Sequence, residues 1–182
     1  MHLSDEQGRA LLKLARAAVE REFDGLAIAA WEEEWLREDG ATFVTLMLHG
    51  DLRGCIGSIE ATRPLGEDVQ RNAISAALRD PRFPSLSRGE LAEVRFEVSL
   101  LSPMIPLDVS TEGELLSVLR PMIDGLVIEW GHHRATFLPS VWEQLPQPRE
   151  FLRHLKRKAG LREDFWAPEM CCWLYGTEKW EE

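Results

Sequence analysis

The residues with the clearest chemical potential surround Cys55, which lies between two glycines. Arg53 precedes it by two positions, and Gly54 and Gly57 lie on either side. A thiolate is a strong nucleophile, and a nearby guanidinium lowers the pKa of a thiol from about 8.5. Glycine is favoured where the backbone needs a positive φ or must approach another group closely. The pattern therefore predicts Cys55 as a candidate catalytic residue, held in a tightly specified bend.

A second interpretation of Cys55 stays open. A cysteine between two glycines also serves as a small apolar side chain that fills a crowded bend. One cysteine and several histidines do not establish a catalytic pair, because residues that are close in space need not be close in sequence. The sequence thus allows a nucleophile, a residue lining a ligand site, or a purely structural cysteine.

Several arginines lie in segments rich in glycine or proline, which restrict the backbone. They are Arg53, Arg63, Arg79 and Arg82. A guanidinium binds a carboxylate or phosphate through two parallel hydrogen bonds, so the set predicts a site for a small anionic or nucleotide-like ligand. The alternative is that these arginines pair with local acids such as Asp80 or Glu60. In that case Arg79–Pro84 is a structural clamp.

No metal or cofactor site is predicted. His132 and His133 lie at the tip of an expected hairpin, and adjacent strand residues point to opposite faces, so the two are poor ligands for one metal ion. The sequence contains no Cys-x-x-Cys, His-Glu-x-x-His, Gly-x-Ser-x-Gly, Walker or Gly-x-Gly-x-x-Gly pattern. The sequence does not identify a cofactor.

The elements that must position these residues are helices mixed with strands. A capping box at Ser4–Gln7 predicts a helix to Glu22, and further helices are expected over 62–80 and 151–159. Strands are expected over 42–48, 93–101 and 170–175, with a hairpin formed by 126–130 and 134–138. The 42–48 run is apolar in both alternating sets, which is typical of a strand near the middle of a sheet. The order indicates an α+β fold with a mixed, mostly antiparallel sheet and flanking helices.

Composition points to one domain in the cytoplasm. The chain has 182 residues with 45% hydrophobic content, enough to bury a sizeable core. Its formal net charge is −10, which disfavours bulk attraction to nucleic acid or anionic membranes. No secretion signal is recognisable at the amino terminus, and the apolar runs are shorter than the roughly 20 residues that span a bilayer. The three cysteines form no disulfide framework, which fits a reducing compartment.

One hexapeptide and several further motifs resemble a known family. Leu52–Gly57 is similar to the hallmark hexapeptide of the AMMECR domain family, protein A of the AmmeMemoRadiSam system. The other motifs follow in the family's order at Thr62–Leu65, Arg79–Pro84, Val98–Leu101, Asp124–Gly125, Ala135–Pro139 and Lys158–Leu161. The resemblance covers about 42–161, which is most of the chain.

The resemblance implies a two-lobed AMMECR-type domain over 1–182, with a larger lobe holding both termini, a smaller inserted lobe and a cleft. It implies ligand-binding roles for residues in the matching motifs, namely Arg53, Gly54, Gly57, Arg63, Arg82 and Thr136. The expected protein binds a small anionic ligand, as an enzyme or an accessory of a modification pathway with Memo-like and radical-SAM partners. The alternative is a non-catalytic protein-interaction module. Reaction, substrate and oligomeric state are not indicated.

Overall fold

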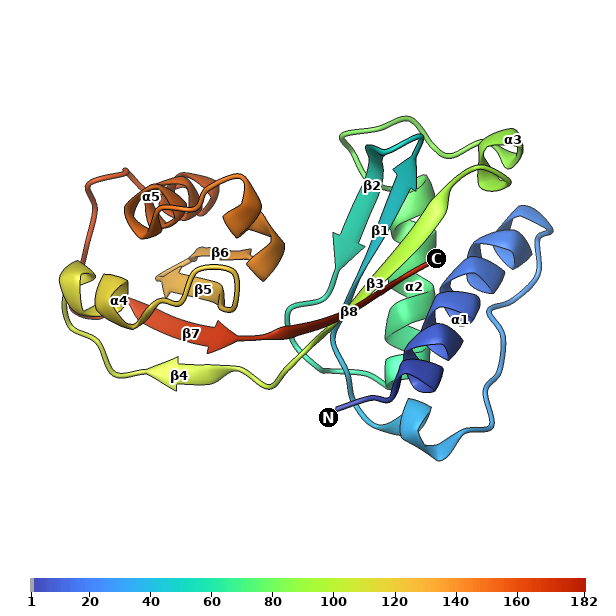
Figure 1. Cartoon of the computed structure of the whole chain (residues 1–182), viewed down its shortest axis with the longest axis horizontal. Coiled ribbons are helices and arrows are strands. Elements are labelled where there is room, and N and C mark those ends of the chain that lie inside the picture. The colour runs from blue at the N-terminus through green and yellow to red at the C-terminus, as the bar shows by residue number, and fades with distance from the viewer. Residues whose placement is uncertain (1) are drawn as a thin grey trace. The chain divides into compact units, whose positions relative to one another are not determined.

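The computed structural model describes residues 2–182 and divides into two compact units. The first comprises the chain up to Leu101 together with Glu178–Glu182, and the second is Ser102–Thr177. Each unit has its own hydrophobic core and its own four-stranded sheet (Figure 1). The α+β class predicted from the sequence is confirmed, with two sheets where one was expected.

The sheet of the first unit has the strand order β2-β1-β3-β8. Its strands are β1 (Thr42–Leu48), β2 (Asp51–Gly57), β3 (Arg95–Leu101) and β8 (Thr177–Glu181). β1 is antiparallel to both of its neighbours, so its predicted central position is confirmed. One face of β1 is fully buried through Val44 and Leu46, whereas Thr45 and Met47 on the other face are half-buried.

Helices α1 (Asp5–Phe23) and α2 (Leu65–Leu78) pack on one face of this sheet (Figure 1). The capping box that predicts the start of α1 is present, with the Ser4 hydroxyl accepting a bond from the Gln7 amide. Residues 24–33 have no regular structure and lead to a short 3₁₀ helix, Glu34–Arg37. Trp31 and Trp35 pack against the core of the first unit.

The hexapeptide segment differs from the expectation. The two glycines predict a bend around Cys55, but Asp51–Gly57 is a strand paired with β1, with a register shift at Arg53. The turn expected between the two strands is present at His49 and Gly50, whose φ angles are 54° and 92°. After α2, an irregular segment and the short helix α3 (Arg88–Leu91) lead into β3.

The second unit contains a sheet of order β4-β7-β5-β6 with two helices. Its elements are β4 (Ile105–Leu107), α4 (Glu112–Val118), β5 (Gly125–Trp130), β6 (His133–Phe137), a 3₁₀ helix (Pro139–Glu143), α5 (Pro148–Lys158) and β7 (Cys171–Tyr175). The predicted hairpin is confirmed as β5 and β6. Trp142 stacks on Phe151 in the buried core, with ring centroids 3.7 Å apart. Across residues 2–182, no helix has both the length and the apolar character needed to cross a bilayer.

Candidate functional site

The outer edge of β2 is bonded by a side-chain pair from the loop that follows α2. The Cys55 amide donates to Asp80 Oδ2 at 2.9 Å, and Arg82 Nη2 donates to the Cys55 carbonyl at 3.1 Å. Arg82 also donates to both Asp80 carboxylate oxygens, and this bonding lowers the pKa of Asp80 well below its usual range. The Asp80–Arg82 pair thus takes the place of a neighbouring strand at an edge that would otherwise be open.

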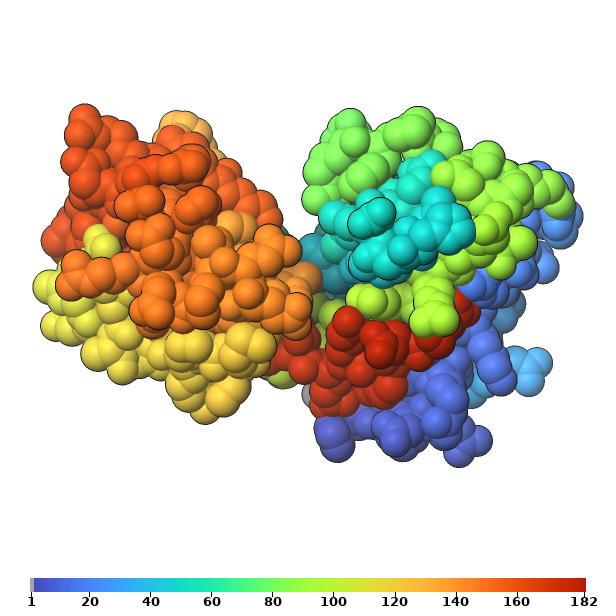
Figure 2. Space-filling view, turned by 45° about the horizontal axis from the view of Figure 1, so that its top comes forward, coloured from blue at the N-terminus to red at the C-terminus, as the bar shows by residue number. Residues whose placement is uncertain are grey.

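Arg53 ties the same strand to the segment before β3. Its Nε donates to Glu90 at 2.8 Å and its Nη1 donates to the Pro84 carbonyl at 2.8 Å. The Arg53 side chain is only 12% exposed. The hydrogen bonds from Arg53 lower the pKa of Glu90 to about 2. In Figure 2 the segment that contains Pro84 and Glu90 (green) lies beside the β1–β2 hairpin (cyan), as these contacts require.

The two glycines of the hexapeptide are needed for close packing and not for a positive φ. A Cβ on Gly54 would lie 2.1 Å from the Ala76 carbonyl oxygen of α2, and one on Gly57 would lie 2.2 Å from the Phe43 ring. Neither glycine is among the residues with positive φ. The expectation of a tight bend is therefore wrong, whereas the expectation of a close approach describes both positions.

The Cys55 side chain lies on the sheet face opposite α2. Gly54 faces α2, and consecutive strand residues point to opposite faces. The Thr45 hydroxyl, directly across the β1–β2 pair, donates to Cys55 Sγ at 3.3 Å. The thiol is half-buried, and the predicted neighbouring cation Arg53 is bonded to Glu90. The catalytic role of Cys55 stays a prediction.

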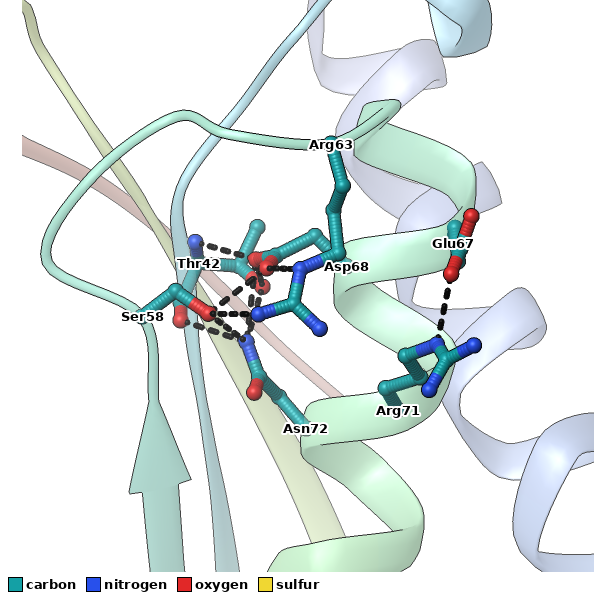
Figure 3. Close-up of polar contacts among 7 residues, drawn as sticks. All are labelled: Thr42, Ser58, Arg63, Glu67, Asp68, Arg71 and Asn72. Carbon is teal, nitrogen blue, oxygen red and sulfur yellow. Dashed lines mark hydrogen bonds and ion pairs between the residues drawn. The ribbon is translucent and has the colours of Figure 1, made fainter.

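A buried polar cluster joins the end of β2 to the first half of α2 (Figure 3). Asp68 is fully buried and accepts bonds from the amide and hydroxyl of Thr42, the hydroxyl of Ser58 and the Asn72 amide. Arg63 Nε lies 3.2 Å from the second Asp68 oxygen. Burial raises the pKa of the Asp68 carboxyl, and its hydrogen-bond donors and the Arg63 charge oppose that rise. The cluster fixes Ser58, Arg63 and Asn72 relative to one another.

These three residues line a pocket within the first unit, with a volume of about 480 Å³. Its walls are formed by Glu22, Ile28, Gly57, Ser58, Arg63, Arg71, Asn72, Ile74, Ser75 and Arg79. Three guanidinium groups and two hydroxyls therefore face one cavity, against a single lining carboxylate. The Asp68 carboxylate that holds Arg63 is buried behind the wall. Such a lining suits an anion.

A second cavity of the first unit, of about 560 Å³, has the opposite character. Its lining includes the carboxylates of Glu93, Glu97, Glu181 and Glu182. These groups repel an anion, although Arg95 and His49 also reach the cavity. Within residues 2–182, no group of three or more His, Cys, Asp or Glu side chains is arranged to hold a metal ion.

Comparison with known proteins decides the family. The AMMECR1 family profile matches residues 12–180. The chain belongs to the AMMECR1 family. It is 38% identical to a protein of Methanothermobacter thermautotrophicus, over 99% of this chain and 96% of that protein. It is also 38% identical to a protein of Thermofilum pendens, over 90% of this chain and 84% of the other.

The fold is shared with a solved crystal structure. The crystal structure of the uncharacterized protein PH0010 from Pyrococcus horikoshii superposes with a TM-score of 0.92 at 33% sequence identity. The match covers 99% of this chain and 93% of the other. The two-sheet α+β architecture is therefore that of an experimentally determined structure.

The predicted site residues fall into three places in this AMMECR1-family chain. Gly57 and Arg63 line the pocket that contains Arg63, Arg71 and Arg79, called the arginine pocket below. Arg53, Gly54 and Arg82 instead hold β2 in position. Thr136 belongs to the second unit. Its hydroxyl is buried, donates to the Leu126 carbonyl at 2.9 Å and bonds the Tyr175 hydroxyl at 2.7 Å. Direct ligand contacts by Arg53, Gly54, Arg82 and Thr136 stay predictions.

Sequence reasoning missed Ser58, Arg71, Asn72 and Ser75 as pocket residues. A signal for part of this set is present in the sequence, because Arg71, Ser75 and Arg79 recur every four residues within and just beyond α2. Side chains at this spacing share one helix face. Ser58 and Asn72 have no comparable signal, since only the fold brings them together.

Proposed function

We propose that the first unit binds a small anionic ligand in the pocket lined by Ser58, Arg63, Arg71, Asn72 and Arg79. The observation that carries this proposal is the convergence of three guanidiniums on one cavity in a chain of net charge −10. In an acidic protein, random placement would favour acidic cavities, as in the cavity lined by Glu93 and Glu97. A cavity lined by three arginines therefore calls for a specific reason.

Hydrogen-bonding capacity supports the same ligand class. Each of the three arginines has an acid nearby, so the pocket holds no large excess of positive charge. A guanidinium has five N–H donors, however, and one carboxylate engages at most a part of them. Arg79 is the most loosely held, since its Nη2 lies 3.8 Å from Glu22, beyond hydrogen-bond distance. An incoming anion can replace such a surface pair at a cost of about 1 kcal/mol or less.

The family motif supports the location. The hexapeptide strand β2 ends at Gly57, and the pocket begins there and at Ser58. Arg53 and Arg82 anchor the strand that leads to it. Because the Cys55 side chain points away from α2, the proposal treats the thiol as separate from the anion pocket. A catalytic role for Cys55 would involve the other face of the sheet.

The wider role is proposed from the family resemblance. It is that of an enzyme or an accessory of a cytoplasmic modification pathway, with Memo-like and radical-SAM proteins as partners. Ligand binding by itself is compatible with either role. The rival proposal is a non-catalytic interaction module, in which the hexapeptide motif fixes a docking surface and no small anion is bound.

Thermal melting with phosphate, sulfate and adenosine monophosphate at fixed ionic strength tests the pocket. A ligand at 100 times its dissociation constant stabilises by about 2.7 kcal/mol, or roughly 5 to 10 °C in Tm for a chain of this size. We expect such a rise for the wild type with at least one anion. Arg71→Gln should lose most of it, with little change in the unliganded Tm, because the Arg71 side chain is 58% exposed.

Arg9→Gln is the matched control. Arg9 lies on the exposed face of α1, lines no part of the pocket and has no ion pair with any described residue. The Arg9→Gln substitution removes one positive charge from the same unit, so this variant should keep the full rise in Tm. If no anion raises the wild-type Tm, the pocket proposal fails and the interaction module replaces it. If Arg71→Gln keeps the rise, the anion binds elsewhere.

A further inference from the structure

The wall that α2 contributes to the pocket is basic at both ends. Arg71, Ser75 and Arg79 follow one another at intervals of four residues and all line the cavity. Since a helix rises 1.5 Å per residue, the Cα atoms of Arg71 and Arg79 lie about 12 Å apart along the wall. Arg71 Nε pairs with Glu67, one turn of α2 further from Arg79, and Arg79 pairs with Glu22. The two guanidiniums are therefore held apart, at opposite ends of the wall, and can contact two separate anionic groups.

The lining between these two ends includes two isoleucine side chains beside Ser75. Ile74 lies next to Ser75 on the same wall, and Ile28 contributes from the irregular segment after α1. At the Arg71 end, Asn72 donates to Ser58 at 3.2 Å and Arg63 Nη2 lies 3.5 Å from the same hydroxyl. This end thus combines two arginines with a hydroxyl and an amide. The Arg79 end has one arginine and the distant Glu22.

Both end arginines are available to a ligand. The side chains of Arg71 and Arg79 are 58% and 67% exposed, and their acid partners are Glu67 and Glu22. Ion pairs at this exposure contribute little to stability, so an incoming anion can replace them. Arg63 is held more firmly, because its partner Asp68 is fully buried. The fixed end therefore positions one anionic group, while Arg79 is placed to receive a second.

We infer that the ligand of this pocket is an elongated molecule with two anionic groups roughly 8–12 Å apart, joined by a partly apolar middle. This inference depends on the proposed anion pocket and specifies its ligand class. The first anionic group binds at Ser58, Arg63 and Arg71. The second binds Arg79, and the middle packs on Ile28 and Ile74.

Calorimetric titration with a matched series of phosphates tests the inference. The probes are hexyl phosphate, hexane-1,6-diyl bisphosphate and propane-1,3-diyl bisphosphate, at constant ionic strength. The six-carbon bisphosphate spans the two ends, whereas the three-carbon one has the same charge and is too short. We expect the six-carbon bisphosphate to bind at least about tenfold more tightly than either other probe, a difference of about 1.4 kcal/mol.

Two variants show which arginines produce the gain in affinity of the six-carbon bisphosphate. Arg79→Gln should reduce the affinity of the six-carbon bisphosphate to that of hexyl phosphate, while hexyl phosphate itself binds as it does to the wild type. Arg71→Gln should weaken all three probes, because each places a phosphate at that end. Arg9→Gln should change none of the affinities. The melting curve of each unliganded variant shows that it is folded.

The outcomes separate this inference from the proposal beneath it. Equal affinity for hexyl phosphate and the six-carbon bisphosphate would overturn the two-anion ligand and leave the anion pocket in place. Equal affinity for the two bisphosphates would show that total charge, and not the distance between the phosphates, sets the affinity. That result would also overturn the two-anion ligand. Absence of binding by every probe and of any rise in Tm would overturn the anion pocket itself.

Discussion

Gly54 and Gly57 differ in what an added methyl group would meet. At Gly54 the obstacle is the Ala76 carbonyl oxygen, a backbone atom inside α2 that cannot move without shifting the helix. At Gly57 the obstacle is the half-buried ring of Phe43, which can rotate away. The same substitution therefore carries different costs at two positions of one hexapeptide.

We expect Gly54→Ala to lower the free energy of unfolding by about 3 kcal/mol, because the added methyl overpacks a rigid site. Gly57→Ala should lower it by only about 1 kcal/mol, because the Phe43 ring can move. Gly113→Ala is the control, because nothing lies within 4 Å of its added methyl and the site is helical, so a small gain is expected. Urea titration gives the three values. A Gly54→Ala variant as stable as the wild type would disprove the close approach of β2 to α2.

At the scale of elements, the edge of β2 is held by side chains that come from a later part of the chain. Arg53 bonds Glu90, 37 positions away, and the depressed pKa of Glu90 is a consequence of that bond. A carboxyl whose pKa is lower in the folded state stabilises the protein above its unfolded pKa. That stability is lost as the pH falls through the folded value.

Replacing Arg53 by Leu should therefore destabilise the protein most at neutral pH, by about 2 kcal/mol or more, since several charged hydrogen bonds are lost. The difference from the wild type should shrink as the pH falls from 4.5 toward about 2, where Glu90 becomes protonated in both proteins. Urea titrations at a series of pH values measure it, with Arg9→Leu as the control for removal of a charge. A difference that does not depend on pH would contradict the assigned bond.

How much of this arrangement the sequence predicts depends on the range of the interactions. The starts of α1 and α4 are predictable because their capping boxes, Ser4–Gln7 and Thr111–Glu114, are local. The β5–β6 hairpin is predictable for the same reason. Strands β2 and β8 are not, because polar edge strands lack the alternation of half-buried ones.

The residues of the candidate site are likewise predictable only where their interactions are local in the sequence. A resemblance in sequence singles out Arg53 and Arg82, but their partners Glu90 and Asp80 decide that they hold a strand edge. Cys55 is conspicuous in sequence for its two glycines, yet the face on which it lies depends on the register of β2 against β1. These facts come from pairing across the fold, which periodicity does not report.

At the scale of the whole molecule, two hydrophobic cores support two units, and the arginine pocket belongs to one of them. All ten lining residues lie between Glu22 and Arg79, within the first unit. A ligand that binds only the folded pocket stabilises the segments that form it, by mass action. The second unit contributes no lining residue to this pocket and gains nothing directly from the ligand.

Hydrogen exchange with and without a bound anion should therefore show local protection. We expect slower exchange in peptides covering α2 and residues 57–63, because their backbone forms the pocket wall and opening it would release the ligand. Peptides from Ser102–Thr177 should exchange at nearly unchanged rates. Arg71→Gln with the same anion serves as the control and should show little added protection anywhere. Equal protection in the second unit would mean that the anion binds there as well, or that the two units open together, and either result would contradict a ligand site confined to the first unit.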